Sequence, residues 1–172
     1  SDGNGGSNTY TINLDVAAVN DAPTLTGETA TLLSGTEDNA YIVSVADLLQ
    51  GYSDVDLGDT LSIESLSAGD GFEVVDNGDG TYTITAPDNF NGDVTLTYQV
   101  TDGLESIEAT QNFNIQAVND NPTAADDDVT TDEDTVINGS LPIADDVDLD
   151  SVTYTLATGA TNGTVEINAD GT

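Results

Sequence analysis

The chain has 172 residues, of which 33 are Asp or Glu, and it contains no Lys, Arg or His, so its formal net charge is −33. Without a cationic side chain it cannot neutralise phosphates, which excludes nucleic acid as an electrostatic partner and direct attraction to an anionic membrane surface. It also lacks Cys and Met, so it has no disulfide, no thiolate nucleophile and no nitrogen or sulfur ligand for zinc.

Alternation of apolar and polar residues predicts β-strands along most of the chain. In chain order, the alternating stretches are 10–16, 81–85, 94–100, 113–115 and 152–156. Asn-Gly and Asp-Gly turn signals separate them, at 76–80, 91–92 and 162–163. Only the stretch 45–50 favours a helix, of a single turn. About seven short strands per ~100 residues predict an all-β fold, a Greek-key β-sandwich.

The sequence repeats itself with a period of about 100 residues, which indicates tandem units. Ala18–Thr24 recurs as Ala117–Thr123. Four shorter blocks recur in the same order: Ser1-Asp2-Gly3 with Thr101-Asp102-Gly103, Glu37-Asp38 with Glu133-Asp134, Asp54–Asp56 with Asp146–Asp148, and Asp79–Thr81 with Asp170–Thr172. We therefore expect an internal piece of a tandem array. Residues 1–19 would be the C-terminal strand or strands of a preceding repeat, 20–118 a complete repeat and 119–172 the N-terminal half of the next.

Acidic residues gather at the ends of the predicted strands rather than over their outer faces. They follow one another as Asp21, Glu37-Asp38, Asp54, Asp56, Asp59, Asp88 and Asp102. Alternate Asp residues in an irregular segment can aim two carboxylates at one point, and calcium takes six to eight such oxygens. Asp-Gly and Asn-Gly also form turns without any metal, and Asp76 and Asp79 are predicted to be turn residues only. A solvated acidic surface in a saline environment is the alternative reading of the charge.

Several of these motifs together resemble a known family. Val118–Pro122 (VNDNP), Thr36–Asp38 (TED), Ser53–Asp56 (SDVD) and Val100–Gly103 (VTDG) are similar to the motifs of the cadherin repeat. Asn89–Gly92 (NFNG), followed by Thr97–Gly103 (TYQVTDG), resembles the cadherin-like tandem repeats of very large bacterial surface adhesins. Those RTX-type proteins are acidic and free of cysteine, and many leave the cell by type 1 secretion.

The resemblance implies cadherin- or immunoglobulin-like domains with Ca²⁺ bound where consecutive domains join. At the top of the complete repeat, it implies the ligands Asn20, Asp21, Asp54, Asp56 and Asp102. At the bottom, it implies Glu37 and Asp88, which would join Asn119, Asp120, Asp146 and Asp148 of the following repeat. Vertebrate cadherins have a Leu-Asp-Arg-Glu motif where this chain has Pro87–Phe90 with one acid, so one or two ions per junction are expected rather than three.

The resemblance implies a structural role outside the cell. The chain would be a calcium-rigidified extender, or stalk, module of a large extracellular bacterial adhesin, acting in cell adhesion and biofilm formation without catalysis. Its partners would be the neighbouring repeats of the same chain, with homotypic contacts bridged by Ca²⁺ as a further possibility. No apolar run approaches the ~20 residues of a membrane span, so no membrane insertion is expected.

Two other functions stay open on the sequence. The first is a module that binds carbohydrate or another surface polymer, which would need exposed aromatic residues. The alternating pattern instead places Tyr10, Tyr82, Tyr98, Phe113 and Tyr154 on the apolar strand faces, and leaves Tyr41 and Tyr52 undecided. The second is a self-associating filament or sheath subunit, which at this net charge would need bridging cations.

Overall fold

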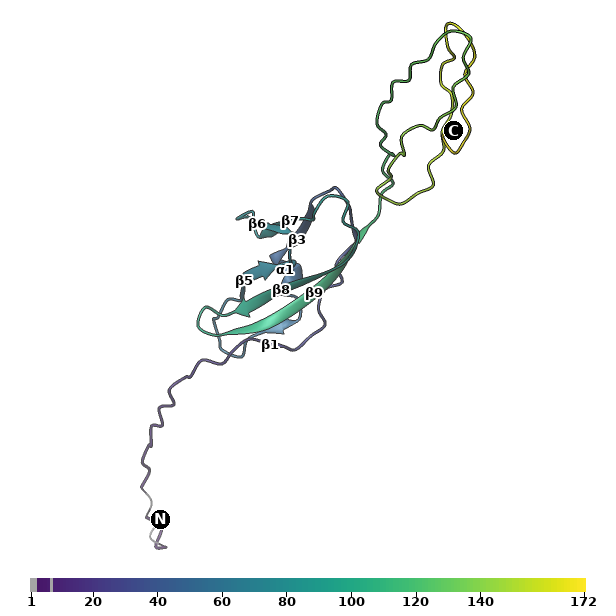
Figure 1. The fold of residues 1–172 in the computed structure, drawn as a ribbon. Helices are drawn as coiled ribbons and strands as arrows, with labels where there is room; N and C mark the ends of the chain where they lie inside the picture. The colour runs from purple at the N-terminus through teal and green to yellow at the C-terminus, as the bar shows by residue number, and fades with distance from the viewer. Residues whose placement is uncertain (1–2, 7) are drawn as a thin grey trace.

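The structure is a computed structural model that describes residues 3–6 and 8–172, and its regular elements all lie between residues 24 and 116. In chain order they are β1 (Thr24–Leu25), β2 (Gly35–Thr36), β3 (Tyr41–Ser44), α1 (Val45–Leu48), β4 (Tyr52–Ser53), β5 (Ser62–Ser67), β6 (Glu73–Asp76), β7 (Thr81–Thr85), β8 (Gly92–Thr101) and β9 (Ser106–Gln116). The N-terminal segment leaves one end of this unit, and the C-terminal loops lie beyond the other (Figure 1).

Two main sheets form a β-sandwich, as the alternation predicts. The larger has the order β2-β9-β8-β5 and the smaller the order β3-β7-β6, while β1 pairs with β4 alone. Strands β8 and β9 form a long antiparallel ladder from Gly92 opposite Ile115 to Thr101 opposite Ser106. Strand β2 runs parallel to β9, although the two lie far apart in the sequence. Sandwich connections of this kind are those of a Greek-key fold.

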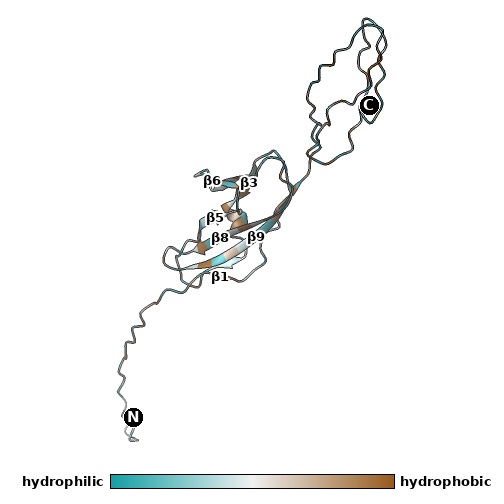
Figure 2. Ribbon diagram, viewed as in Figure 1, coloured by the Kyte–Doolittle hydropathy of each residue, from teal (hydrophilic) through white to brown (hydrophobic). Residues whose placement is uncertain are grey.

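The core lies between the sheets and follows the alternation of the sequence. On β8, Val94, Leu96, Tyr98 and Val100 are buried while the intervening threonines are exposed. Buried residues on β9 and β7 complete the same cluster, among them Phe113 and Ile84. Figure 2 shows the resulting bands of hydrophobic and hydrophilic residues along β8 and β9.

The predicted helical turn is confirmed as α1. Its N-cap Ser44 accepts a hydrogen bond from the Asp47 backbone N–H at 3.0 Å, which satisfies one of the free donors at a helix N-terminus. Leu48 of this helix is fully buried. The Tyr98 hydroxyl donates to the Leu48 carbonyl oxygen at 2.9 Å, so the helix is joined to the centre of β8.

The turn between β6 and β7 confirms that Asp76 and Asp79 act as turn residues. Asp76 accepts from the Gly78 N–H at 2.8 Å, and Asp79 accepts from the N–H of Thr81 at 3.0 Å and from its hydroxyl at 2.6 Å. These hydrogen bonds lower the pKa of Asp79, the hydroxyl bond being the largest cause. Neither carboxylate belongs to an acidic cluster.

Two predicted strands do not form, at 10–16 and at 152–156. Tyr10, Ile12, Leu14 and Val16 are 77–85 % exposed, so the prediction that Tyr10 faces a core is wrong. A strand needs a neighbour for its backbone donors and acceptors, and no described segment pairs with residues 10–16. Ser1 and Asp2, the start of one repeated block, lie outside the described residues.

The segment 119–172 folds as loops, with an isolated bridge between Thr123 and Asp145. Tyr154 is half-buried there, and its hydroxyl donates to the Pro142 carbonyl oxygen at 2.9 Å. The long β8–β9 ladder, on which the larger sheet of the complete unit is built, has no counterpart within these residues. Alternation at 152–156 therefore has no ladder to join.

Candidate metal centre

The structure gathers carboxylates into two clusters, one at each end of the β8–β9 ladder. The first cluster is Asp54, Asp59 and Asp102, and the second cluster is Glu37, Asp120 and Asp148. Within each cluster, one carboxylate oxygen from each residue lies within 4.8 Å of the others. The second cluster brings together a residue of the folded unit, residues 24–116, and two residues of the segment that follows it.

In the first cluster, short loops hold the carboxylates in place. Asp102 directly follows β8, and its Oδ1 accepts from the N–H groups of Leu104 at 2.6 Å and Glu105 at 2.7 Å. Its Oδ2 accepts from the Asn20 side-chain amide at 2.9 Å. Asp54 directly follows β4, and its Oδ1 accepts from the Asp56 N–H at 2.8 Å.

The second cluster is built around Glu37, which is only 1 % exposed. Its backbone N–H donates to the Gln116 carbonyl oxygen at 3.0 Å, which extends the parallel pairing of β2 with β9. Its two carboxylate oxygens accept from the Val118 N–H and from the Asn91 side-chain amide, the latter at 3.1 Å. Glu37 is therefore fixed at the point where the chain leaves the unit.

The sequence repeat is also a repeat of hydrogen bonds. The Asp21 N–H donates to Asp56 Oδ2 at 2.7 Å, and the Asp120 N–H donates to Asp148 Oδ2 at 2.6 Å. The bond from the Asp56 N–H to Asp54 Oδ1 likewise recurs as one from the Asp148 N–H to Asp146 Oδ1, at 3.0 Å. In each repeat, one bond thus ties the linker to the Asp-x-Asp loop that follows it, and a second bond closes the loop on itself.

The two Asp-x-Asp loops differ by one residue. The first reads Asp-Val-Asp-Leu-Gly-Asp and turns at Gly58, whose φ is 109°. The second lacks the glycine, and Leu149 turns the chain at a φ of 62°. A left-handed conformation is unfavourable for a residue with a side chain, so the surrounding bonds hold the second loop in a strained turn. Such strain is concentrated at functional sites.

The carboxylates of the two clusters differ in how readily they carry their negative charge. Loss of solvation is the main cause that raises the pKa of Asp59, and the charges of Asp54, Asp56 and Asp102 add to it. The pKa of Asp120 is raised in the same way, by loss of solvation and then by nearby carboxylates, Asp38 first. In contrast, the donors from Glu105, Leu104 and Asn20 lower the pKa of Asp102.

Two buried oxygen atoms, Asp54 Oδ2 and Asp120 Oδ2, have no hydrogen-bond partner, and each belongs to one of the clusters. Buried polar atoms in proteins are nearly always paired. Since the chain has no Lys, Arg or His, no side-chain cation can pair them. The donor set is entirely oxygen, which fits a hard divalent cation such as calcium.

The structure places the eleven predicted ligands in three groups. Glu37, Asp54, Asp102, Asp120 and Asp148 are members of the clusters. Asn20, Asp56 and Asp146 are each hydrogen-bonded to a member, and Asp21 donates its N–H to Asp56. Asp88 is exposed and belongs to neither cluster, and Asn119 is exposed with its amide donating to the Asp120 carbonyl oxygen.

Two contributors were missed by reasoning from the sequence. Asp59 belongs to the first cluster. Its position in Asp-x-Asp-x-x-Asp was the available signal, because an irregular loop of that length can curl back on itself. Asn91 donates to Glu37. No sequence pattern pointed to this contact, because only the tertiary fold brings residues 37 and 91 together.

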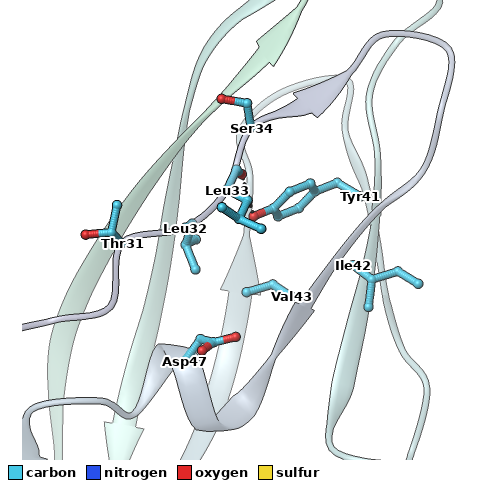
Figure 3. A pocket seen from close by; sticks show the side chains of 8 residues that line it. All are labelled: Thr31, Leu32, Leu33, Ser34, Tyr41, Ile42, Val43 and Asp47. Atoms are coloured by element: carbon cyan, nitrogen blue, oxygen red, sulfur yellow. Dashed lines mark hydrogen bonds between the residues drawn. The ribbon is translucent and has the colours of Figure 1, made fainter.

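A groove away from both clusters has a different character. It has a volume of about 400 Å³ and lies between residues 31–34 and strand β3 (Figure 3). The Tyr41 hydroxyl crosses it to donate to the Leu33 carbonyl oxygen at 2.9 Å. Asp47 is the one carboxylate in its lining, so this groove cannot supply the several acidic oxygens of a calcium site.

Comparisons with known proteins agree with this architecture. Residues 19–116 match the family model of a cadherin-like domain, and residues 119–172 match that of a bacterial Ig domain. Bacterial Ig domains are typical of surface proteins, and the two matches together fit an adhesin-type β-sandwich module. The chain belongs to the cadherin-like domain family, whose members usually bind calcium.

Similarity to other proteins is limited. No curated protein matches the chain. A solved endo-fucoidan hydrolase of glycoside hydrolase family 107 shares 22 % identity with a TM-score of 0.40, covering 56 % of this chain and 14 % of its own. A variant of the same hydrolase shares 23 % identity with a TM-score of 0.41 over the same shares. This chain therefore matches only a small part of those enzymes.

Among the described residues, no helix is long and apolar enough to cross a membrane.

Proposed function

We propose that this chain is a calcium-rigidified extender module of a large extracellular bacterial adhesin. The observation that carries the proposal is the second cluster, which joins Glu37 of the cadherin-like unit to Asp120 and Asp148 of the next segment. A cation held there would bind two consecutive units at once. Rigidity of the junction would then depend on the ion.

Repulsion within the clusters gives the physical reason. Two like charges 4 Å apart repel by about 4 kcal/mol at an effective dielectric constant of about 20. The carboxylate oxygens of each cluster lie within 4.8 Å of one another. In the second cluster, whose members come from consecutive units, this repulsion would push the two units apart in the absence of a cation. A divalent cation turns this repulsion into attraction, and the junction stiffens.

The repeat suggests two cation positions at each junction. The first position would use one residue of the Glu37 type from the preceding unit. It would use two residues from the following unit, namely the Asp of the linker and the second Asp of the Asp-x-Asp loop. The other would use residues of the Asp54, Asp59 and Asp102 type, all within a single unit. Each cluster in this chain represents one of these positions, and calcium would supply the charge compensation that no side chain provides.

The wider role follows from such a junction. Many copies in a row would form a stalk that carries a ligand-binding domain away from the cell surface, in adhesion and biofilm formation. The module itself would catalyse nothing and would contact mainly its neighbouring repeats. Secretion through a type 1 pathway would suit it, because low cytosolic calcium would leave the junctions loose until export.

Calorimetric titration of the whole chain with calcium, combined with small-angle X-ray scattering with and without chelator, tests the proposal. We expect binding in the micromolar-to-millimolar range and a longer maximum dimension with calcium. The variant Asp120→Asn should lose much of both effects. Asp93→Asn is the matched control, because Asp93 is a surface carboxylate outside the clusters. Absence of heat at millimolar calcium would rule out the proposed function.

The same measurements address the two alternatives. A scattering mass that grows with protein concentration in calcium would favour a self-associating filament subunit. Binding of polysaccharide in the absence of calcium would favour a carbohydrate-binding module, although Tyr98 and Phe113 are buried and Tyr41 is stacked on Phe113 with ring centroids 4.0 Å apart.

A further inference from the structure

We propose that Asn91 is a positioning residue of the second cluster, and that it holds the Glu37 carboxylate toward the junction in the calcium-free protein. This inference rests on the proposed function and adds a residue that does not itself need to bind the ion. It follows from the hydrogen bonds, burial and charge of Glu37.

Glu37 is an acid buried to 99 % in a chain without any basic residue. A buried charge is strongly unfavourable unless donors or a counter-ion compensate it. Among the described residues, two groups donate to its carboxylate: the Val118 backbone N–H on Oε1 and the Asn91 side-chain amide on Oε2. Asn91 is therefore the one side chain that compensates this charge.

The loop that carries Asn91 contacts Glu37 and its neighbour together. The Asn89 backbone N–H donates to Asp38 Oδ1 at 3.1 Å, while the Asn91 amide donates to Glu37 Oε2 at 3.1 Å. Both Asp38 and Asn89 have positive φ, at 59° and 57°, which is unfavourable for residues with side chains although Asn and Asp tolerate it best. The loop 88–91 is thus shaped to hold the Glu37-Asp38 pair.

The sequence motif assigned the ligand in this loop to Asp88, but the structure turns a different residue toward the cluster. Asp88 is exposed and outside both clusters, whereas Asn91 reaches Glu37 just before β8 begins at Gly92. An amide donates an N–H and adds no charge. It can therefore orient a carboxylate without increasing the repulsion among Glu37, Asp120 and Asp148.

A double-mutant cycle between positions 37 and 91 tests this role in the whole chain. Calcium affinity is measured by calorimetry in a background carrying Asp54→Asn and Asp59→Asn, so that the heat reports on the second cluster. We expect Asn91→Ala to weaken binding about tenfold, and Glu37→Gln to weaken it at least as much. The double variant should bind no more weakly than Glu37→Gln alone, because the two residues act through one carboxylate.

The control variant is Asn114→Ala, which removes a chemically similar bond, from the Asn114 amide to Asp93 Oδ1 at 2.9 Å, between paired residues on a solvent-exposed part of the β8–β9 ladder. It should leave calcium affinity unchanged. If Asn91→Ala does not fold in chelator, the same cycle is measured with Asn91→Leu, which keeps about the size of the side chain, removes its N–H donors and adds no charge. A coupling of threefold or more between positions 37 and 91 supports the inference.

The outcomes separate the two proposals. If the wild-type chain binds no calcium, the proposed function fails and the positioning role fails with it. If the wild-type chain binds calcium but Asn91→Ala binds equally well, the positioning role alone is overturned. Independent, additive effects of the two substitutions overturn it as well, because they would show that Asn91 acts on overall stability rather than through Glu37.

Discussion

At the scale of single residues, the fold places carboxylates in two different environments. Asp79, Asp102 and Asp170 accept local hydrogen bonds that lower their pKa values below the ordinary 3.8. Asp59 and Asp120 lose solvation beside other carboxylates, which raises theirs. Hydrogen bonds favour the charged form of the first group, which includes Asp102, a member of the first cluster. Lost solvation and neighbouring charges disfavour the charged form of Asp59 and Asp120, so a cation beside either carboxylate would relieve that cost.

The raised pKa values predict how the calcium-free chain responds to pH. An acid whose folded-state pKa lies above its unfolded value binds its proton more readily in the folded protein, so it destabilises the fold at pH 7 and this effect disappears as the pH falls. Acids with lowered pKa values act oppositely, and their stabilisation is lost below 3.8. The melting temperature in chelator should therefore rise from pH 7 to about 4 and fall below it.

Asp120→Asn tests the contribution of one residue to that profile. We expect this variant to melt higher than the wild type in chelator at pH 7, because one repelling charge is gone. The melting temperature of the variant in chelator should also rise less than that of the wild type between pH 7 and pH 4. In saturating calcium the order should reverse, with the variant melting lower, because a ligand is lost. Equal melting curves for the two proteins in chelator at pH 7 would contradict the repulsion between Asp120 and its neighbouring carboxylates.

At the scale of elements, strand pairing decides which alternating stretches become strands. Residues 94–100 and 10–16 alternate equally well, yet the first forms the centre of a sheet and the second is exposed along its length. The difference is the presence of β5 and β9 on either side of β8. Periodicity thus identified the faces of strands, and pairing partners decided whether they formed.

The single helical turn depends on the sheet in a way that can be tested. Burial raises the pKa of Tyr98 well above its ordinary value, so its hydroxyl stays protonated and donates to the buried Leu48 carbonyl oxygen. Tyr98→Phe should lower the free energy of unfolding by about 1–2 kcal/mol, because it leaves that carbonyl unpaired.

Urea denaturation in calcium measures this loss. Tyr82→Phe is the matched control, since the Tyr82 ring is half-buried and no hydrogen bond of its hydroxyl is described; it should change stability by less than about 0.5 kcal/mol. Calcium affinity should be the same in both variants, because neither ring contacts a cluster. A calcium affinity altered by Tyr98→Phe would show that α1 is coupled to the metal centre.

At the scale of the whole molecule, charge and connection act together. The chain carries a net charge of −33, and its two carboxylate clusters lie at the two ends of the cadherin-like unit, next to the N-terminal segment and the C-terminal loops that Figure 1 shows. The core between the sheets is apolar, so repulsion in the second cluster acts between the unit and the segment that follows it. Ions should therefore change shape and stability through the junctions first.

Screening of charge by salt and specific binding of calcium should stabilise the chain to different extents, and thermal melting can tell them apart. Raising NaCl from 50 to 500 mM shortens the screening length from above 10 Å to well below it, and the calcium-free chain should gain stability. Each 1 kcal/mol gained corresponds to about 4–8 °C for a domain of this size. One millimolar calcium should give at least the same increase, whereas magnesium should give less, because it demands octahedral geometry and dehydrates reluctantly. Equal effects of the two divalent ions would indicate screening alone.

The sequence by itself determined the class of fold, the repeat, the single helical turn, the turn roles of Asp76 and Asp79, and the acids gathered at strand ends. These depend on local periodicity and on short-range hydrogen bonds, which a few neighbouring residues specify. Tertiary structure alone decided that Asp59 completes the first cluster, that Asn91 holds Glu37, and that Asp88 lies outside. It also decided that 10–16 and 152–156 remain unpaired. Contacts between residues 37, 91, 120 and 148 exist only because β2, β8 and β9 bring distant segments to one end of a sheet, and no local pattern encodes that meeting.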